Sequence, residues 1–200
     1  TDMQTFENPM GTDGFEFVEY TAPDPEQLGA LFEQLGFTAV ARHRSKDVIL
    51  YRQGRVNFIV NREPDSFAQS FARVHGPSAC AFAVRVKDAA KAYHRALELG
   101  AKPFQGKVGP MELNIPAIRG IGDSLIYLVD RYPGNGGNLT IYDVDFVPIA
   151  GAAARPSVRS GRRSASSNSN GSPPWSAKIT PSQRPPVATG TQATALVSTI

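Results

Sequence analysis

The same order of segments, a strand, a helix and three more strands, occurs twice in the first 132 residues, and this repetition constrains the fold more than any other feature of the sequence. In the first copy, GFEFVEYTAP places Phe17 and Glu19 on one face, which predicts a strand. Asp24 as N-cap and Gly36 as C-terminal stop predict a short amphipathic helix. The runs FTAVARHR, DVILYRQG and RVNFIVNRE then predict three short strands.

The second copy begins at Cys80. CAFAVRV predicts a strand, Asp88 and Gly100 bound a predicted helix, and KPFQ, MELNIPAI and DSLIYLVDRY predict three further strands. An Asp cap and a Gly stop are common at helix ends, so the helices alone are weak support for a repeat. The shared order of five segments is stronger support.

A βαβββ unit leaves one apolar sheet face that it cannot bury alone, so two such units are expected to pair and share a core. We therefore predict an α+β fold of paired βαβββ modules. The predicted domain covers residues 14–150, with modules at about 14–63 and 80–131. Residues 1–13 would form an N-terminal arm.

The segment between the two modules has Phe67, Phe71 and Val74 at helical spacing and ends at Gly76–Pro77. It predicts a connecting helix over about residues 64–77.

The charge distribution separates the last 50 residues from the rest. Residues 1–150 hold 15 Lys and Arg against 18 Asp and Glu, whereas residues 151–200 hold six basic residues and no acidic one. The net charge of +3 therefore comes from the tail, and the predicted domain has no charge pattern of a nucleic-acid-binding protein. A single cysteine and no apolar leader or membrane segment favour a cytoplasmic protein.

Several stretches resemble the N-terminal half of bacterial 4-hydroxyphenylpyruvate dioxygenase. They are FENPMGTDGFEFVEYTAP, GFTAVARHRSKDVILYRQG, NFIVNREPDSFA, ELNIPAIRGIGDSLIYLVDRY and IYDVDFVPI, and the resemblance runs from about Phe6 to Ile149. This family belongs to the vicinal-oxygen-chelate group, whose domains are paired βαβββ modules, so the resemblance agrees with the repeat.

The resemblance implies an enzyme of tyrosine breakdown that uses Fe(II) and dioxygen to convert 4-hydroxyphenylpyruvate, a 2-oxo acid, into homogentisate and carbon dioxide. It also implies a homo-oligomer. A hydroxymandelate synthase-like fragment is an alternative within the same family. A second alternative is a non-catalytic small-molecule-binding module of the same fold.

An Fe(II) ion that works with dioxygen and a 2-oxo acid needs two histidines and a carboxylate bound on one face of the metal. The chain has three histidines. We interpret His43 as a solvated strand-end residue beside arginines, His75 as a residue at the end of the connecting helix, and His94 as an exposed helix residue. None of them has the spacing of a metal site, so we expect no catalytic, cofactor-binding or metal-ligating residue in this chain.

Two other groups have structural interpretations. Gly120 and Gly122 lie in RGIGDS, which predicts a turn between strands and lacks the Lys-Ser/Thr signature of a phosphate loop. TIYDVDFVPI predicts a final strand that carries Asp143 and Asp145 on one solvated face.

In the family resembled, the iron ligands come from a second domain that should begin soon after YDVDFVPI. Residues 151–200 instead contain ten Ser and six Pro without periodicity, which predicts a disordered basic tail. A shifted reading frame is an equally open origin for this tail. Nucleic-acid binding is disfavoured because Trp175 is its one aromatic residue. We expect the chain as given to be truncated and inactive.

Overall fold

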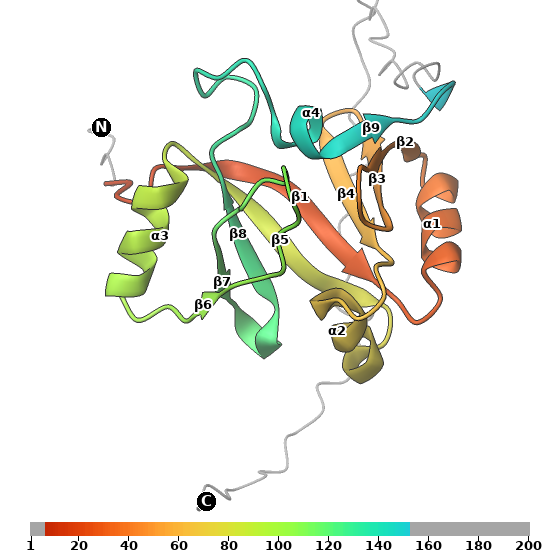
Figure 1. Ribbon diagram of the computed structural model, residues 1–200, viewed down its shortest axis with the longest axis horizontal. Coiled ribbons are helices and arrows are strands. Elements are labelled where there is room, and N and C mark those ends of the chain that lie inside the picture. Colours follow the sequence, from red (N-terminus) through yellow and green to blue (C-terminus); the bar gives the residue numbers. More distant parts are fainter. Residues whose placement is uncertain (1–6, 153–200) are drawn as a thin grey trace, which may run out of the picture. The chain divides into compact units, whose positions relative to one another are not determined.

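A computed structural model describes residues 7–152 (Figure 1). In chain order the elements are β1 (Thr12–Thr21), α1 (Pro25–Gln34), β2 (Thr38–His43), β3 (Val48–Gln53), β4 (Val56–Asn61), α2 (Phe67–His75), β5 (Ser78–Val86), α3 (Ala89–Glu98), β6 (Pro103–Phe104), β7 (Ala117–Arg119), the 3₁₀ helix η1 (Ile121–Asp123), β8 (Leu125–Val129), α4 (Ile141–Asp145) and β9 (Phe146–Pro148). The predictions for residues 153–200, a disordered or frameshifted tail, lie outside the described residues.

The described strands form one nine-stranded sheet in the order β6-β7-β8-β5-β1-β4-β3-β2-β9. In the first module β1 pairs in parallel with β4, and in the second module β5 pairs in parallel with β8. The antiparallel pairing of β1 with β5 joins the two modules at the centre of the sheet. The predicted α+β fold of paired βαβββ modules is therefore confirmed.

The apolar residues divide between the two faces of the sheet. On one face, α1 packs Phe32 into a cluster with β3 and β4, and α3 packs Ala92 into a second cluster with β5 and β8 (Figure 1). The opposite face carries a cluster to which both modules and the C-terminal segment contribute: Phe17, Ala41, Val48, Leu50, Ile59, Ala83, Val129, Ile141 and Phe146. The two modules thus share a core on the inner face of the sheet.

The two module helices begin and end in the same way. The Asp24 carboxylate accepts a hydrogen bond from the Gln27 amide at 3.2 Å, and the Asp88 carboxylate accepts one from the Lys91 amide at 2.9 Å. Gly36 and Gly100 follow the helices with φ of 92° and 91°, in a region that L side chains rarely adopt. Local sequence signals therefore placed both helix ends correctly.

The connection between the modules contains a helix, α2, with Ser66 as its N-cap. Within residues 7–152, no helix combines the length and apolar character that crossing a membrane requires.

Two of the predicted strands are wrong in part. Residues 111–116 are not a strand; only Ala117–Arg119 of that segment pairs, as β7. The segment 140–149 begins with a helix, α4, because Thr140 and Asp143 form a reciprocal capping box that outweighs the strand-like composition. Only Phe146–Pro148 forms the expected strand, β9, which pairs with β2.

Candidate functional site

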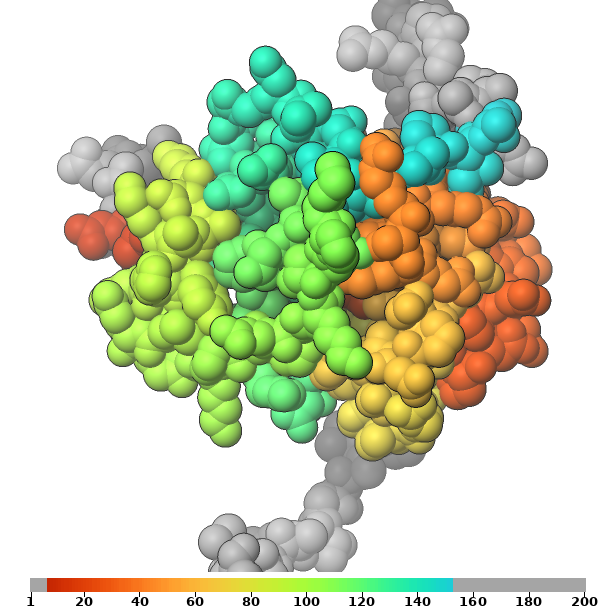
Figure 2. All heavy atoms as spheres, in the orientation of Figure 1, coloured from red at the N-terminus to blue at the C-terminus, as the bar shows by residue number. Residues whose placement is uncertain are grey.

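The inner face of the sheet lines a cavity of about 300 Å³. The loop between β6 and β7, residues 105–116, lies across this cavity, and we call it the strap. In Figure 2 the strap is the bright green band that meets the orange residues of the first module. The cavity therefore lies between the central strands and a loop of the second module, and it is partly open.

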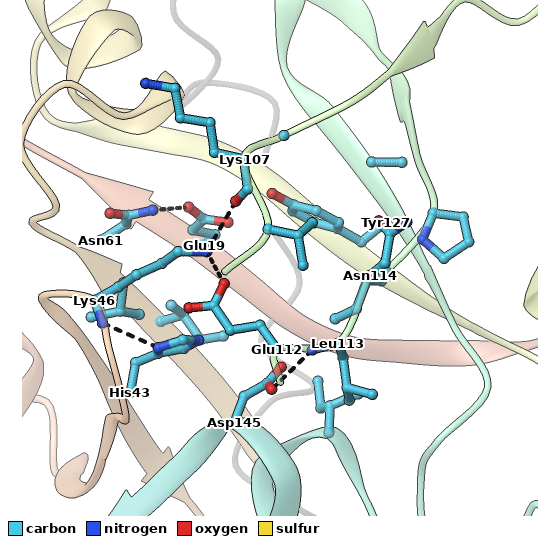
Figure 3. Close-up of a pocket in the computed structure, with 18 of the residues that line it drawn as sticks. Glu19, His43, Lys46, Asn61, Lys107, Glu112, Leu113, Asn114, Tyr127 and Asp145 are labelled. Atoms are coloured by element: carbon cyan, nitrogen blue, oxygen red, sulfur yellow. Dashed lines mark hydrogen bonds and ion pairs between the residues drawn. The ribbon is translucent and has the colours of Figure 1, made fainter. Parts of the chain in front are cut away.

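Glu112 attaches the strap to the turn between β2 and β3. Its Oε2 accepts from the Lys46 ammonium at 2.7 Å and from the Gly109 amide at 2.7 Å, and its Oε1 accepts from the Ser45 hydroxyl. Lys46 Nζ also donates to the Lys107 carbonyl at 3.2 Å (Figure 3). Burial by itself would raise the pKa of Glu112, but the hydrogen bonds from Lys46, Ser45 and Gly109 outweigh it and lower the pKa to about 2.

A second attachment of the strap comes from α4. The Asp145 carboxylate accepts from the Leu113 amide at 3.1 Å, and Asp145 is only 7% exposed. Asp143, by contrast, is exposed and belongs to the capping box. The prediction that both carboxylates lie on one solvated strand face is wrong, because the helix turns Asp145 inward.

Glu19 lies at the floor of the cavity on β1, with 7% exposure. Its Oε1 accepts from the Asn61 side-chain amide at 2.8 Å, and the Asn61 carbonyl oxygen in turn accepts from the Glu63 backbone amide at 3.0 Å. Burial raises the pKa of Glu19, and the Asn61 hydrogen bond, the Cys80 thiol and the Lys46 charge offset this in part. Glu19 is thus a buried carboxyl whose pKa is raised above the ordinary value, chiefly by burial.

His43 lines the same cavity, at the end of β2, and is half-buried. Its Nδ1 accepts from the backbone amides of Ser45 and Lys46, both at 3.3 Å, which leaves the proton of the neutral ring on Nε2. Burial lowers the pKa of His43, and the Lys46 charge lowers it further. His43 lies at the end of a strand, as interpreted from the sequence, but its ring is half-buried and bonded to the turn after β2 and is not fully solvated.

The other histidines are elsewhere. His75 is exposed at the end of α2, where the centroids of its ring and of the Phe71 ring are 4.2 Å apart. His94 is exposed on α3. Gly120 and Gly122 lie in the turn between β7 and β8, with Gly122 at φ 64°. Neither histidine lines the cavity.

The cavity residues do not fit an Fe(II) ion. Among residues 7–152, no group of three or more His, Cys, Asp and Glu side chains is arranged to hold a metal. His43 is the one histidine that lines the described cavity, and the Glu112 oxygens already bind Lys46, Ser45 and Gly109. The adjacent Lys46 ammonium would also repel a cation.

Paired βαβββ modules that share an inner face define the vicinal-oxygen-chelate class of folds, and the described domain has this architecture. The family model for hydroxyphenylpyruvate dioxygenase, HPPD, N-terminal, matches residues 6–147. The chain therefore belongs to the family of N-terminal domains of hydroxyphenylpyruvate dioxygenase.

Individual relatives agree with this assignment. The chain is 57% identical over 151 residues to a 4-hydroxyphenylpyruvate dioxygenase of Pseudomonas sp. (strain P.J. 874), a match that covers 76% of this chain and 42% of that protein. It thus spans less than half the length of this relative.

Two solved structures share the fold. A xylose isomerase-like TIM barrel/4-hydroxyphenylpyruvate dioxygenase fusion protein matches with a TM-score of 0.59 and 42% identity, over 70% of this chain and 22% of that chain. A mutant 4-hydroxymandelate synthase from Streptomyces coelicolor matches with a TM-score of 0.56 and 23% identity, over 72% of this chain and 44% of that chain. At this identity the second match shows the common fold alone.

Sequence reasoning missed most of the cavity. It assigned no role to Glu19, Lys46, Asn61, Glu112 or Tyr127, which the fold brings together from three strands, one turn and the strap. One signal was available: Glu19 shares a strand face with Phe17, which is the core-facing pattern, so a buried carboxyl could have been predicted.

Proposed function

We propose that the chain is the N-terminal domain of a 4-hydroxyphenylpyruvate dioxygenase-like protein and that this domain does not itself carry out catalysis. The complete protein would use Fe(II) and dioxygen to convert the 2-oxo acid 4-hydroxyphenylpyruvate into homogentisate and carbon dioxide. The domain would contribute structural support and subunit contacts in a cytoplasmic homo-oligomer. A hydroxymandelate synthase-like parent protein is the alternative within the same family.

The observation that carries this proposal is the chemistry of the cavity. The family match is to an N-terminal domain. In this domain the inner face of the sheet carries Glu19, which accepts a hydrogen bond from Asn61 and lines the cavity beside Tyr127. The nearby carboxylates bind the strap through hydrogen bonds. These side chains are used for structure and leave no two-histidine, one-carboxylate set in the described domain.

The purified 200-residue chain is expected to bind no stoichiometric Fe(II) and to turn over no 4-hydroxyphenylpyruvate. The measurement is iron content after anaerobic reconstitution, followed by oxygen uptake when the substrate is added. Stoichiometric iron together with homogentisate formation would contradict the proposal.

A fusion protein provides the matching positive control. Residues 1–150 of this chain would be joined to the part of the Pseudomonas relative that follows the matched region. We expect this fusion to take up oxygen with 4-hydroxyphenylpyruvate and to form homogentisate, because this chain is 57% identical to the segment that it would replace. A folded fusion that takes up no oxygen with 4-hydroxyphenylpyruvate would contradict the proposed supporting role of this domain.

The cavity favours a second candidate function, a small-molecule-binding module. It is concave and partly open, its walls are largely apolar, and it contains a few convergent polar groups, which are the usual properties of ligand sites.

A further inference from the structure

We propose that the cavity binds a small uncharged aromatic molecule that carries a hydrogen-bond donor, such as a phenol or an aromatic amine, and that Glu19 accepts this donor. This inference rests on the second candidate function and is independent of whether the complete protein is a dioxygenase.

Glu19 provides the acceptor. Its Oε1 is held by Asn61 at 2.8 Å, and the bond from Glu63 to Asn61 Oδ1 at 3.0 Å fixes the orientation of the Asn61 amide. Among residues 7–152, no N–H or O–H group donates to the other carboxyl oxygen, Oε2, and the weak Cys80 thiol is the further donor near this carboxyl. Oε2 is not among the fully buried atoms without a partner, so it is open to a donor that enters the cavity.

The walls of the cavity are largely apolar. The Phe17 and Tyr127 rings have their centroids 5.8 Å apart and their planes tilted by 45°, and Ile59, Leu113 and Phe146 extend the apolar surface. In Figure 3 the Glu19 carboxyl lies between Asn61 and Tyr127. A ring against Phe17 could therefore direct a substituent to Glu19.

The charges of the cavity disfavour an anion. Lys46 is already paired with Glu112 at 2.7 Å, and the Lys107 side chain extends away from the labelled cavity residues in Figure 3. Glu19, Glu112 and Asp145 all line the cavity, so a ligand carboxylate would meet three acidic groups, while Lys46 is paired and the Lys107 ammonium points away. This distinguishes the proposed ligand from the 2-oxo acid substrate of the family.

Binding can be measured on the full chain with three ligands of similar shape by isothermal titration calorimetry. They are 4-methylphenol, toluene, which lacks the donor, and 4-methylbenzoate, which is an anion. We expect 4-methylphenol to bind at least about tenfold more tightly than either of the other two. No binding of 4-methylphenol, or tighter binding of 4-methylbenzoate, would overturn the proposal.

The variant Glu19→Gln tests the acceptor. The Asn61 donor requires an oxygen at Oε1, so the glutamine NH₂ would replace Oε2 and present a donor where an acceptor is needed. We expect affinity for 4-methylphenol to fall about tenfold while affinity for toluene is kept. Glu33→Gln, at an exposed site on α1, is the matched control and should bind like the unaltered chain.

A measurement on the unaltered chain keeps the proposal testable if Glu19→Gln does not fold. On addition of 4-methylphenol, NMR signals of the Asn61 side-chain amide and the Tyr127 ring should shift. Shifts confined to residues outside the cavity would overturn the proposal. None of these binding experiments uses iron or oxygen, so their failure would leave the dioxygenase proposal unaffected.

Discussion

At the scale of single residues, Glu112 carries most of the attachment of the strap. Its two carboxyl oxygens accept from Lys46, Ser45 and Gly109, and its side chain is only 8% exposed. The pKa of Glu112 falls from an ordinary 4.5 to about 2 when the protein folds. Between these two values the unfolded chain binds more protons than the folded chain, so the stabilisation by Glu112 is complete above pH 4.5 and is lost as the pH falls towards 2.

The variant Glu112→Gln is therefore expected to lower the free energy of unfolding by about 1 kcal/mol at neutral pH. The difference from the unaltered chain should shrink near pH 3, because Glu112 itself begins to be protonated in the unfolded chain there. Urea unfolding followed by far-UV circular dichroism at both pH values measures this. Glu33→Gln removes the same charge from an exposed site and serves as control. An equal loss at both pH values would show that Glu112 acts by packing instead of by its charge.

At the scale of elements, both module helices depend on a glycine directly after the C-cap. Gly36 and Gly100 have φ of 92° and 91°, and this conformation lets the chain leave the helix and start the next strand. A Cβ at Gly100 would meet nothing within 4 Å, whereas one at Gly36 would meet the Gln53 amide nitrogen at 2.6 Å. Backbone conformation is therefore the whole cost at Gly100.

Gly100→Ala is expected to lower the free energy of unfolding by about 1–2 kcal/mol, the usual cost of a left-handed conformation for an L residue. Gly106→Ala in the strap is the matched control, because Gly106 has no positive φ and its added Cβ would make only an ordinary contact with Phe104 at 3.5 Å. Chemical denaturation of both variants tests this. If the two substitutions cost the same, the special role of Gly100 is refuted.

At the scale of the whole described domain, the two modules share their central strand pairing, a buried ion pair and the inner-face cluster. The central pairing of β1 with β5 belongs to both modules, and the buried Glu16 carboxylate accepts from Arg85 Nε of the other module at 2.5 Å. The inner-face cluster also takes residues from both. The superposition of residues 14–63 on 80–131 stays a prediction of the repeat.

We expect the domain to unfold in a single cooperative transition. Far-UV circular dichroism, which reports backbone structure, and near-UV circular dichroism, which reports packed tyrosines such as Tyr127, should give the same urea midpoint. Two separated midpoints would indicate that each module is stable alone and that the shared core contributes little.

The sequence alone determined the features that depend on neighbouring residues. The Asp24 and Asp88 caps, the glycine stops, and the alternation of the strands around Phe17 are local signals, and the structure has the helices and central strands that they predict. The pairing of two modules followed from the repeat, because a single βαβββ unit cannot bury its own sheet face.

The tertiary structure decided the cavity. Glu19 and Asn61 are 42 residues apart, and Ser45 and Glu112 are 67 residues apart, so no local pattern could predict that they bond. Residues 111–116 of the strap form no strand; the Glu112 side chain binds Lys46, and the Leu113 amide donates to Asp145, which α4 turns towards the strap. Such contacts form only after strand pairing has brought distant segments together. The sequence contains the residues of the site, but only long-range packing sets their arrangement, so the site could not be predicted from local patterns.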